Sequence, residues 1–323
     1  MSAESFPKTM SEFDERFHSE EACRQYLMEV RWPEGYRCPS CGHGRYWPVP
    51  GHLLECRSCG RQTSLTAGTA LHGTRKPLRM WFRAIWWVST QKTGGSAKGL
   101  QRLLGLGSYQ TAWAWLQKLR RAMVRAGREP LEGPVEIDDG FIGGEEEGVV
   151  GRQTFKKAKI VVAVEVPGAN RREIGRVRLQ VVEDFSRESL IGFVAENVAP
   201  GSAVITDDWS GYAPLCRRGF RHEVRPAVAA KKRKADLLPN VHVVISLLKR
   251  WLLGTHHGAV RPKHLQHYLD EFTFRHNRRK SRHVGKIFYR VLQGAAGTQA
   301  TPYWQLVNRS APDQPLHMGS PLA

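Results

Sequence analysis

The sequence predicts a multidomain protein that combines α+β and α/β structure, with a small metal-binding module, then a helical region, then an α/β domain. Three observations carry this prediction. Two Cys-x-x-Cys pairs lie near the N-terminus, strongly apolar helical patterns follow them, and strand patterns begin after a linker rich in Gly and Pro. A chain of 323 residues is long enough to bury more than one hydrophobic core.

The charge balance narrows the class of partner. The chain has 49 Lys and Arg residues against 30 Asp and Glu residues, a net charge of +19. An excess of this size favours a polyanionic partner, and DNA or RNA comes first. The sequence has no long apolar run and no basic-then-apolar signal segment at its N-terminus. We therefore expect a cytoplasmic protein with no membrane partner.

Residues 1–30 are predicted to form an N-terminal helical segment, because apolar side chains recur there at helical spacing. These side chains are Phe13, Phe17, Cys23, Tyr26 and Leu27.

Residues 31–75 predict a zinc ribbon. Cys38 and Cys41 form one pair, Cys56 and Cys59 form a second, and a glycine follows each pair. Four thiolates in two tight turns give the closed tetrahedral coordination of a structural Zn²⁺ site. Only two further cysteines occur in the chain, and this pattern favours metal binding over a disulfide framework.

Residues 76–128 predict a helix-turn-helix unit. Helical patterns at 77–91, 97–104 and 108–123 are separated by turns that contain glycine. A helix, a turn and a basic helix are typical of a DNA-reading unit. The side chains expected to be available to DNA are Gln110, Thr111, Trp113, Gln117, Lys118, Arg120 and Arg121. The alternative is an ordinary packing unit of three helices.

Residues 129–300 predict an α/β domain, followed by a tail at 301–323. Strand patterns lie at 135–139, 159–166, 177–182 and 202–208, and helical patterns at 186–196, 239–254 and 262–277. Three strands, a helix, a fourth strand and later helices outline an RNase H-like layer. The helix at 262–277 is expected to be the last long one, with loose chain from Gly294 on.

Two of the predicted strands end in paired carboxylates. Asp138 and Asp139 end the first strand, and Asp207 and Asp208 end the fourth. Carboxylates at the ends of neighbouring strands can share a divalent metal ion. Asp138 and Asp207 are the predicted ligands, because the second residue of each pair alternates to the opposite face of its strand.

The helical pattern at 239–254 adds a third group to this site. His242 and Lys249 lie seven residues apart, so the same side of the helix carries both. A core-facing stripe is predicted from Val244, Leu247, Leu248 and Trp251. The alternative is a surface histidine and a surface lysine beside that stripe. Two carboxylates with a third group on a helix are typical of phosphodiester cleavage with two Mg²⁺ ions, and Lys249 would then face a phosphate.

The sequence resembles a bacterial insertion-sequence transposase of the 1595 family, which has a zinc ribbon and an ISXO-type DDE domain. The matching segments are 31–42, 56–60, 137–144, 206–212, 248–258 and 268–279. The resemblance implies an enzyme that binds transposon ends, cleaves DNA with divalent metal and joins the 3′ hydroxyl to target DNA. It also implies a homodimer or larger assembly on double-stranded DNA in the bacterial nucleoid. By motif, Asp138 and Asp207 match the catalytic aspartates, and Lys249 matches the basic residue that follows them.

One position departs from the family pattern. Many relatives have Glu where this chain has His242, and a neutral imidazole suits Mn²⁺ better than Mg²⁺. His242 is therefore expected to be a metal ligand or a general base, with Glu271 as the next candidate for the third ligand. The other class of function left open is an inactive, transposase-derived zinc-ribbon protein that only binds DNA.

Two basic runs flank the acidic strand ends. Positions 217–234 hold eight basic residues and one acid, and positions 271–290 hold seven and one. The first run includes the continuous cluster Lys231, Lys232, Arg233 and Lys234. Both runs are expected to contact DNA phosphates.

Overall fold

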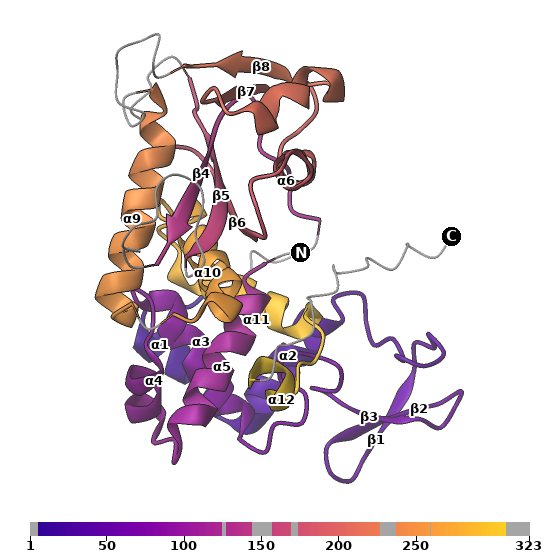
Figure 1. The fold of residues 1–323 in the computed structure, drawn as a ribbon. Helices are drawn as coiled ribbons and strands as arrows, with labels where there is room; N and C mark the ends of the chain where they lie inside the picture. The colour runs from indigo at the N-terminus through magenta and orange to yellow at the C-terminus, as the bar shows by residue number, and fades with distance from the viewer. Residues whose placement is uncertain are drawn as a thin grey trace.

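The computed structural model describes residues 6–124, 127–143, 157–168, 174–226, 237–258 and 260–307. Within these ranges the chain forms a three-stranded sheet, a group of helices, and a five-stranded sheet with helices on both faces (Figure 1). The predicted mixture of helix and sheet is confirmed. None of the helices in these ranges is both long and apolar enough to cross a membrane.

The N-terminal helices form where the sequence predicts them. They are α1 (Met10–Arg16), α2 (Glu20–Arg31), α3 (Leu78–Thr90), α4 (Ala97–Leu104) and α5 (Tyr109–Ala122). Hydroxyl groups cap the starts of four of them, because Thr9, Ser19, Ser96 and Ser108 each accept a hydrogen bond from the first turn. The turn between α4 and α5 begins at Gly105, whose φ of 60° lies in the left-handed region.

A helix near the C-terminus completes this helical core. α11 (Val284–Gly297) packs against α2, α3 and α5, and its Phe288 and Leu292 are fully buried there. Gly294 lies so close to the carbonyl of Ala122 that any side chain would overlap it. The helix at 262–277 is therefore not the last long one, contrary to the expectation from the sequence. The chain from Gly294 on is not loose either, because α11 continues to Gly297 and α12 (Tyr303–Val307) follows. The buried residues Phe288, Val291, Leu292 and Ala295 recur at helical spacing, so the sequence does carry the pattern of α11.

The small sheet is the predicted ribbon. β1 (Tyr46–Val49), β2 (Leu53–Cys56) and β3 (Gln62–Ser64) pair antiparallel in that order. Arg31, the last residue of α2, anchors the ribbon to the helical core. Its guanidinium donates hydrogen bonds to the carbonyls of Leu65 and Ala67, just after β3.

The large sheet carries the acidic strand ends. Its strands are β4 (Pro134–Ile142), β5 (Ala158–Glu165), β6 (Val177–Val182), β7 (Ala203–Thr206) and β8 (Arg221–Val224). The order is β6-β5-β4-β7-β8, antiparallel from β6 to β4 and parallel from β4 to β8. The first four match predicted strands. The sequence does not predict β8, because its largely exposed, polar residues lack an apolar alternation.

Four helical elements cover the two faces of this sheet. They are α6 (Arg187–Asn197), the 3-10 helix η1 (Ser210–Arg218), α9 (Pro239–His256) and α10 (Leu265–Asn277), which follows η2 (Pro262–His264). On β5, Ile160 and Val162 pack against α9 and α10, whereas Val161 and Ala163 pack against α6 and η1. The period-two alternation of a strand thus separates two cores, one on each side of the sheet.

α9 joins the sheet to the helical core, as Figure 1 shows. Its buried side chains are Val241, Val244, Ile245, Leu248 and Leu252, together with Asn240. Leu247, which the sequence places in the core stripe, is 37% exposed, because the stripe that meets the sheet lies one position away. At the other end of α9, the Trp251 indole N–H and the Thr255 hydroxyl both donate to the carbonyl of Thr93, at 2.7 and 2.8 Å.

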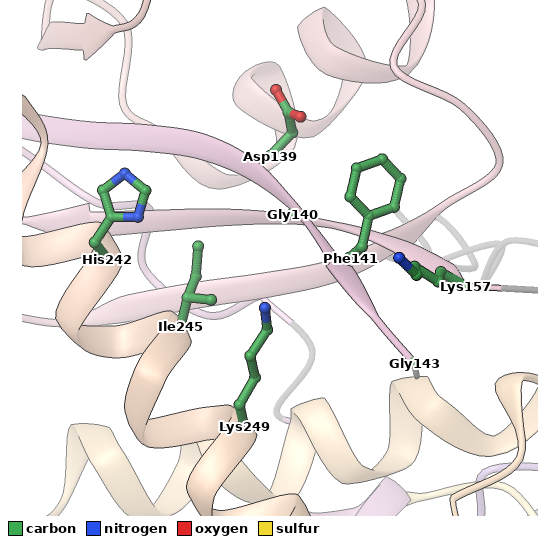
Figure 2. A pocket seen from close by; sticks show the side chains of 8 residues that line it. All are labelled: Asp139, Gly140, Phe141, Gly143, Lys157, His242, Ile245 and Lys249. Atoms are coloured by element: carbon green, nitrogen blue, oxygen red, sulfur yellow. The ribbon is translucent and has the colours of Figure 1, made fainter. Parts of the chain in front are cut away.

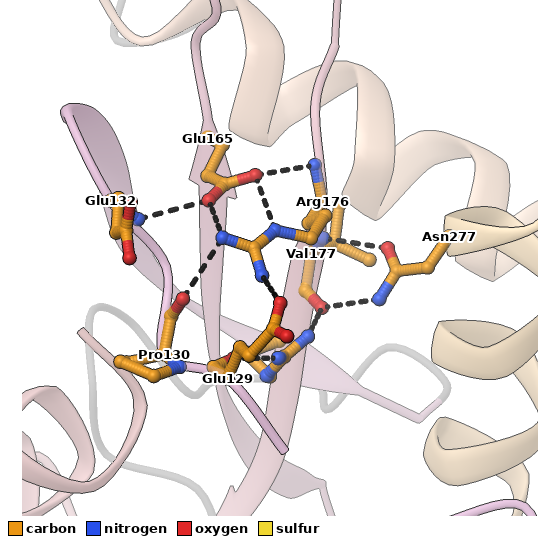
Figure 3. Close-up of polar contacts among 8 residues, drawn as sticks. Glu129, Pro130, Glu132, Glu165, Arg176, Val177 and Asn277 are labelled. Carbon is orange, nitrogen blue, oxygen red and sulfur yellow. Dashed lines mark hydrogen bonds and ion pairs between the residues drawn. The ribbon is translucent and has the colours of Figure 1, made fainter. Parts of the chain in front are cut away.

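A polar network fixes the start of β4 to the ends of β5 and β6 (Figure 3). Glu165 accepts hydrogen bonds from the Arg176 guanidinium and from the backbone N–H of Glu132, the latter at 2.9 Å. Burial alone would raise the pKa of Glu165, but these hydrogen bonds lower it. The Asn277 side chain pairs with both backbone groups of Val177. The strand that carries Asp138 is therefore held firmly at its beginning.

Candidate functional site

The four predicted zinc ligands come together in the ribbon. The Sγ atoms of Cys38 and Cys59 are 3.7 Å apart, and those of Cys41 and Cys56 are 3.5 Å apart. All four sulfurs lie within 4.8 Å of one another. A tetrahedral site with Zn–S bonds of about 2.3 Å separates its sulfurs by about 3.8 Å. The donor set and the geometry therefore fit a structural zinc ion.

Two backbone turns set the positions of these sulfurs. The N–H of Gly42 donates to the carbonyl of Cys38 at 2.9 Å, and the N–H of Gly60 donates to that of Cys56 at 3.0 Å. Backbone N–H groups in the first turn, that of Cys41 most strongly, lower the pKa of Cys38 to about 6. The pKa of Cys56 is lowered in the same way. The turns thus favour the thiolate form of Cys38 and Cys56. For Cys59 the backbone N–H of Arg61 lowers the pKa, but the neighbouring cysteines, Cys41 first, together with burial raise it to about 11.

Loss of one thiolate should open this closed site. We expect about one zinc ion per native chain, and loss of that zinc in Cys38→Ser or Cys59→Ser. Elemental analysis of the purified protein measures this directly. The control is Cys216→Ser, which changes an exposed cysteine far from the ribbon in sequence and should keep its zinc. Native protein without zinc would contradict the assignment.

Asp138 and Asp207 lie at the same end of two neighbouring parallel strands. The parallel pairing of β4 with β7 runs as far as Glu136 with Ile205, and each aspartate follows two residues later on its own strand. Both side chains are buried, with residue exposures of 4% and 2%. Asp138 accepts a hydrogen bond from the N–H of Asp139 at 2.9 Å, and Asp207 accepts one from the N–H of Trp209 at 3.1 Å. Each carboxylate thus has one oxygen engaged by a backbone N–H group of its own segment.

His242 faces Asp138 from the first turn of α9. Its Nε2 is 3.4 Å from Oδ2 of Asp138. A groove of about 400 Å³ borders this point, and Figure 2 shows His242, Ile245 and Lys249 projecting toward it from successive turns of the helix. The other residues that line the groove are Asp139, Gly140, Phe141, Gly143 and Lys157. One side of α9 therefore carries both His242 and Lys249, as the spacing predicts.

The side chains of the three predicted catalytic ligands are too far apart to bind one metal ion together as they stand. Among the described residues, the ligand atoms of the four cysteines all lie within 4.8 Å of one another, close enough to share one ion. Asp138, Asp207 and His242 do not meet this limit, so a shared ion would require side-chain rotation in at least one of them. Asp208 is exposed and Asp139 is half-buried in the groove wall.

Two family models match the chain. Residues 18–62 match the transposase zinc-ribbon domain, and residues 130–277 match the ISXO2-like transposase domain, both of the IS1595 group. The chain belongs to the IS1595 transposase family. It is also 28% identical, over 289 residues, to an uncharacterized protein in transposable element ISH50 of Halobacterium salinarum. That similarity covers 80% of this chain and 91% of the relative. The resemblance stated from the sequence motifs is confirmed.

In this IS1595-family chain a further carboxylate positions α9. Glu136 is 1% exposed, and its Oε2 accepts hydrogen bonds from the backbone N–H groups of Asn240 and Val241 at 2.8 and 3.1 Å. Its Oε1 accepts a third bond from the Asn240 side chain at 3.0 Å. α9 has no capping side chain of its own, so Glu136 satisfies its first N–H groups and opposes the positive end of its dipole.

The contact made by Glu136 also sets the spacing of the catalytic groups. Glu136 and Asp138 are two residues apart on one face of β4, and Asn240 and His242 are two residues apart on α9. The contact between Glu136 and Asn240 therefore holds the helix at the position where His242 meets Asp138. Sequence reasoning missed this role, because a long-range cap leaves no local pattern.

Removing the charge of Glu136 should loosen this arrangement. We expect Glu136→Gln to lower the free energy of unfolding by about 1.5–3 kcal/mol, the typical size for hydrogen bonds to a buried charged group. Thermal and denaturant unfolding measure the change. The matched control is Glu188→Gln, because Glu188 is an exposed acid in the first turn of α6 and should cost less than about 1 kcal/mol. If the two changes lowered the free energy of unfolding equally, Glu136 would not be the residue that positions α9.

Glu271, the alternative third ligand, has a different role. Its Oε2 accepts a hydrogen bond from Nε of Arg120 at 2.7 Å, and its Oε1 accepts one from Nε of Arg275 at 2.8 Å. Arg275 also donates to the carbonyls of Val88 and Gln91 at the end of α3, at 2.7 and 2.6 Å. Glu271 thus joins α3, α5 and α10, and arginines occupy both of its carboxylate oxygens. Arg275, counted in the second basic run, points inward.

Two residues expected to face DNA are inside the protein. Gln117 is fully buried and Arg120 is 2% exposed, because α5 packs on α10. The prediction is wrong for both. On the same helix Gln110 is exposed, and four others are half-buried: Thr111, Trp113, Lys118 and Arg121. The lysine-rich cluster at 231–234 lies outside the described residues.

Proposed function

We propose that this chain is an active DNA transposase that binds the ends of an insertion sequence, cleaves DNA there and transfers the strand to a target. The observation that carries the proposal is the approach of His242 to Asp138 beside the end of β7, where Asp207 follows. Buried carboxylates are costly unless positive charge or hydrogen bonds compensate them. Their position beside a groove that also contains Lys249 favours a site for a divalent ion and a phosphate.

Each residue then has a distinct task. Mg²⁺ or Mn²⁺, when bound, would activate the attacking hydroxyl group and stabilise the leaving oxygen. Asp138 and Asp207 would hold the ions, because carboxylate oxygens are the ligands these hard cations prefer. His242 would supply the third donor, or take the proton of the attacking water as a general base. Lys249 would contact a phosphate next to the scissile bond.

The architecture supports the same reading. Three antiparallel strands followed by two parallel ones, with helices on both faces, agree with an RNase H-like domain from β4 to α10. α11 lies inside the expected bounds 129–300 but packs with the N-terminal helices. α4 and α5 would act as a helix-turn-helix unit, reading DNA from the exposed first turn of α5, where Tyr109 and Gln110 lie. The zinc ribbon would bind the DNA next to the segment that α5 contacts. Because two transposon ends must be joined, we infer a homodimer or larger assembly that works at the nucleoid.

Loss of either aspartate should abolish DNA cleavage without changing DNA affinity. We expect Asp138→Asn and Asp207→Asn each to abolish metal-dependent cleavage of a duplex that carries the terminal sequences. DNA affinity should stay near the native value, because each change removes a charge but little volume. Cleavage and fluorescence anisotropy on the same duplex measure both quantities. Asp208→Asn, an exposed neighbour on the same segment, is the control and should remain active. An equal loss in this control would shift the assignment to the second residue of the pair.

A further inference from the structure

An exposed aromatic side chain stands on the outer face of the zinc ribbon. Trp47 on β1 is 54% exposed, although large aromatic side chains usually gain most from burial. Its neighbour Tyr46 points the other way and packs against Tyr36, with 4.9 Å between the ring centroids, in the small core beside the cysteines. Trp47 therefore adds little to the packing of the ribbon, and much of its indole ring faces the solvent.

An arginine lies directly on this tryptophan. The guanidinium carbon of Arg57 is 3.5 Å from the centroid of the Trp47 ring. The backbone N–H of Arg57 donates to the carbonyl of Arg45 at 3.1 Å, so a second arginine belongs to the same edge of the ribbon. We define the ribbon face as Trp47, Arg45 and Arg57. It presents a flat cationic and aromatic surface, and a guanidinium held in this plane keeps N–H donors at its rim.

The charges around the ribbon face are strongly one-sided. Four arginines between Tyr36 and Ser64 are exposed: Arg37, Arg45, Arg57 and Arg61. Among the ribbon's acids, Glu34 is exposed, whereas Glu55 is half-buried and accepts a hydrogen bond from the Gln62 side chain at 2.8 Å. In Figure 1 the ribbon also projects away from the large sheet, so its outer strands remain accessible to a large partner. Both features suit a polyanion.

We propose that the ribbon face is a DNA-contacting surface, with Arg57 and Arg45 on backbone phosphates and the Trp47 indole packed against the sugars between them. The inference rests on the proposed binding of transposon ends and names the surface that supplies part of it. Contacts of this kind add affinity and fix the position of the protein, whereas base-specific reading is left to other elements. The ribbon face would thus strengthen binding to any duplex about equally.

The test compares two exposed tryptophans in the full-length protein. Trp47→Ala should weaken binding to a terminal-sequence duplex and to an unrelated duplex roughly tenfold each, the size of one lost aromatic contact. Trp304→Ala, which removes a tryptophan that is 62% exposed on α12, should leave both affinities unchanged. Arg57→Gln should reduce the slope of log affinity against log salt by about one. Zinc content, measured on every variant, shows that the ribbon is intact.

Each outcome decides the proposal. If Trp47→Ala binds both duplexes as tightly as Trp304→Ala, while the wild-type chain binds and cleaves, the ribbon face is not a DNA surface and the proposed function stands. If Trp47→Ala changes self-association in sedimentation but not DNA affinity, the face is an interface between copies of the chain, and the DNA assignment is overturned. A wild-type chain that binds neither duplex would overturn both the inference and the proposed function.

Discussion

Glu271→Gln is expected to lower the free energy of unfolding by about 3–5 kcal/mol, the typical cost of breaking a buried ion pair from one side. Glutamine has nearly the same shape, but it leaves the guanidinium groups of Arg120 and Arg275 without a carboxylate. The Arg120 side chain is 2% exposed, so water cannot replace the lost partner. The change should also loosen the attachment of α3 and α5 to α10, because Glu271 connects them.

The pH dependence of stability gives a second measurement on the same residue. Burial would raise the pKa of Glu271, but the charges of Arg120 and Arg275 and their hydrogen bonds outweigh it and lower the pKa to about 2. Since the pKa falls on folding, the carboxylate contributes fully above pH 4.5 or so, and the contribution is lost as the pH falls toward 2. The stability difference between wild type and Glu271→Gln should therefore narrow in acid.

Denaturant unfolding at several pH values checks both expectations. Asp270→Asn is the matched control, because Asp270 is the adjacent carboxylate on α10 and is only half-buried, with a hydrogen bond from Gln266. Its effect on the free energy of unfolding should stay within about 1 kcal/mol. If Glu271→Gln is as stable as this control, the three-residue network does not hold the helices together.

His242→Ala is expected to abolish strand cleavage in both Mg²⁺ and Mn²⁺ while the protein still binds DNA. α9 should survive, because alanine is the best helix former and the buried stripe of the helix is untouched. Ser246→Ala, one turn further along α9 and exposed, is the control and should cleave normally. Cleavage rates on a terminal-sequence duplex, with binding measured in parallel, give the comparison.

The replacement His242→Glu separates the two roles proposed for this histidine. A ligand role predicts retained cleavage and better use of Mg²⁺, because carboxylate oxygens suit that ion. A general-base role predicts partial loss in both metals. If His242→Ala instead cleaves at the wild-type rate, the third ligand lies elsewhere, and Asp139 is the next candidate because it lines the same groove.

Local patterns in the sequence carry much of the fold. The cysteine spacing and the continuous apolar run of β5 each depend on residues close together in the chain, and both were predictable. The same holds for the shared side of His242 and Lys249, which follows from helical spacing alone.

Features made by distant segments were not predictable. Glu136 caps a helix whose first residues lie 104 positions away, and nothing near either segment marks the pairing. Arg120 has the sequence context of a surface cation, and only the packing of α10, which brings Glu271 to it, shows that it is buried. α11 is a different case, because Phe288, Val291, Leu292 and Ala295 recur at helical spacing and the helix was predictable. Its packing against the N-terminal helices was not.

The packing of α11 into the N-terminal helices has a consequence for how the protein is made. The ribosome synthesises the ribbon and α1–α5 first, but Phe288, Val291 and Leu292, which fill the centre of that core, emerge only near the end of translation. The N-terminal part therefore cannot complete its core during synthesis, in contrast to domains that fold one after another. A copy truncated before residue 284 should yield an incomplete, aggregation-prone product, and not a DNA-binding fragment that competes with the intact protein.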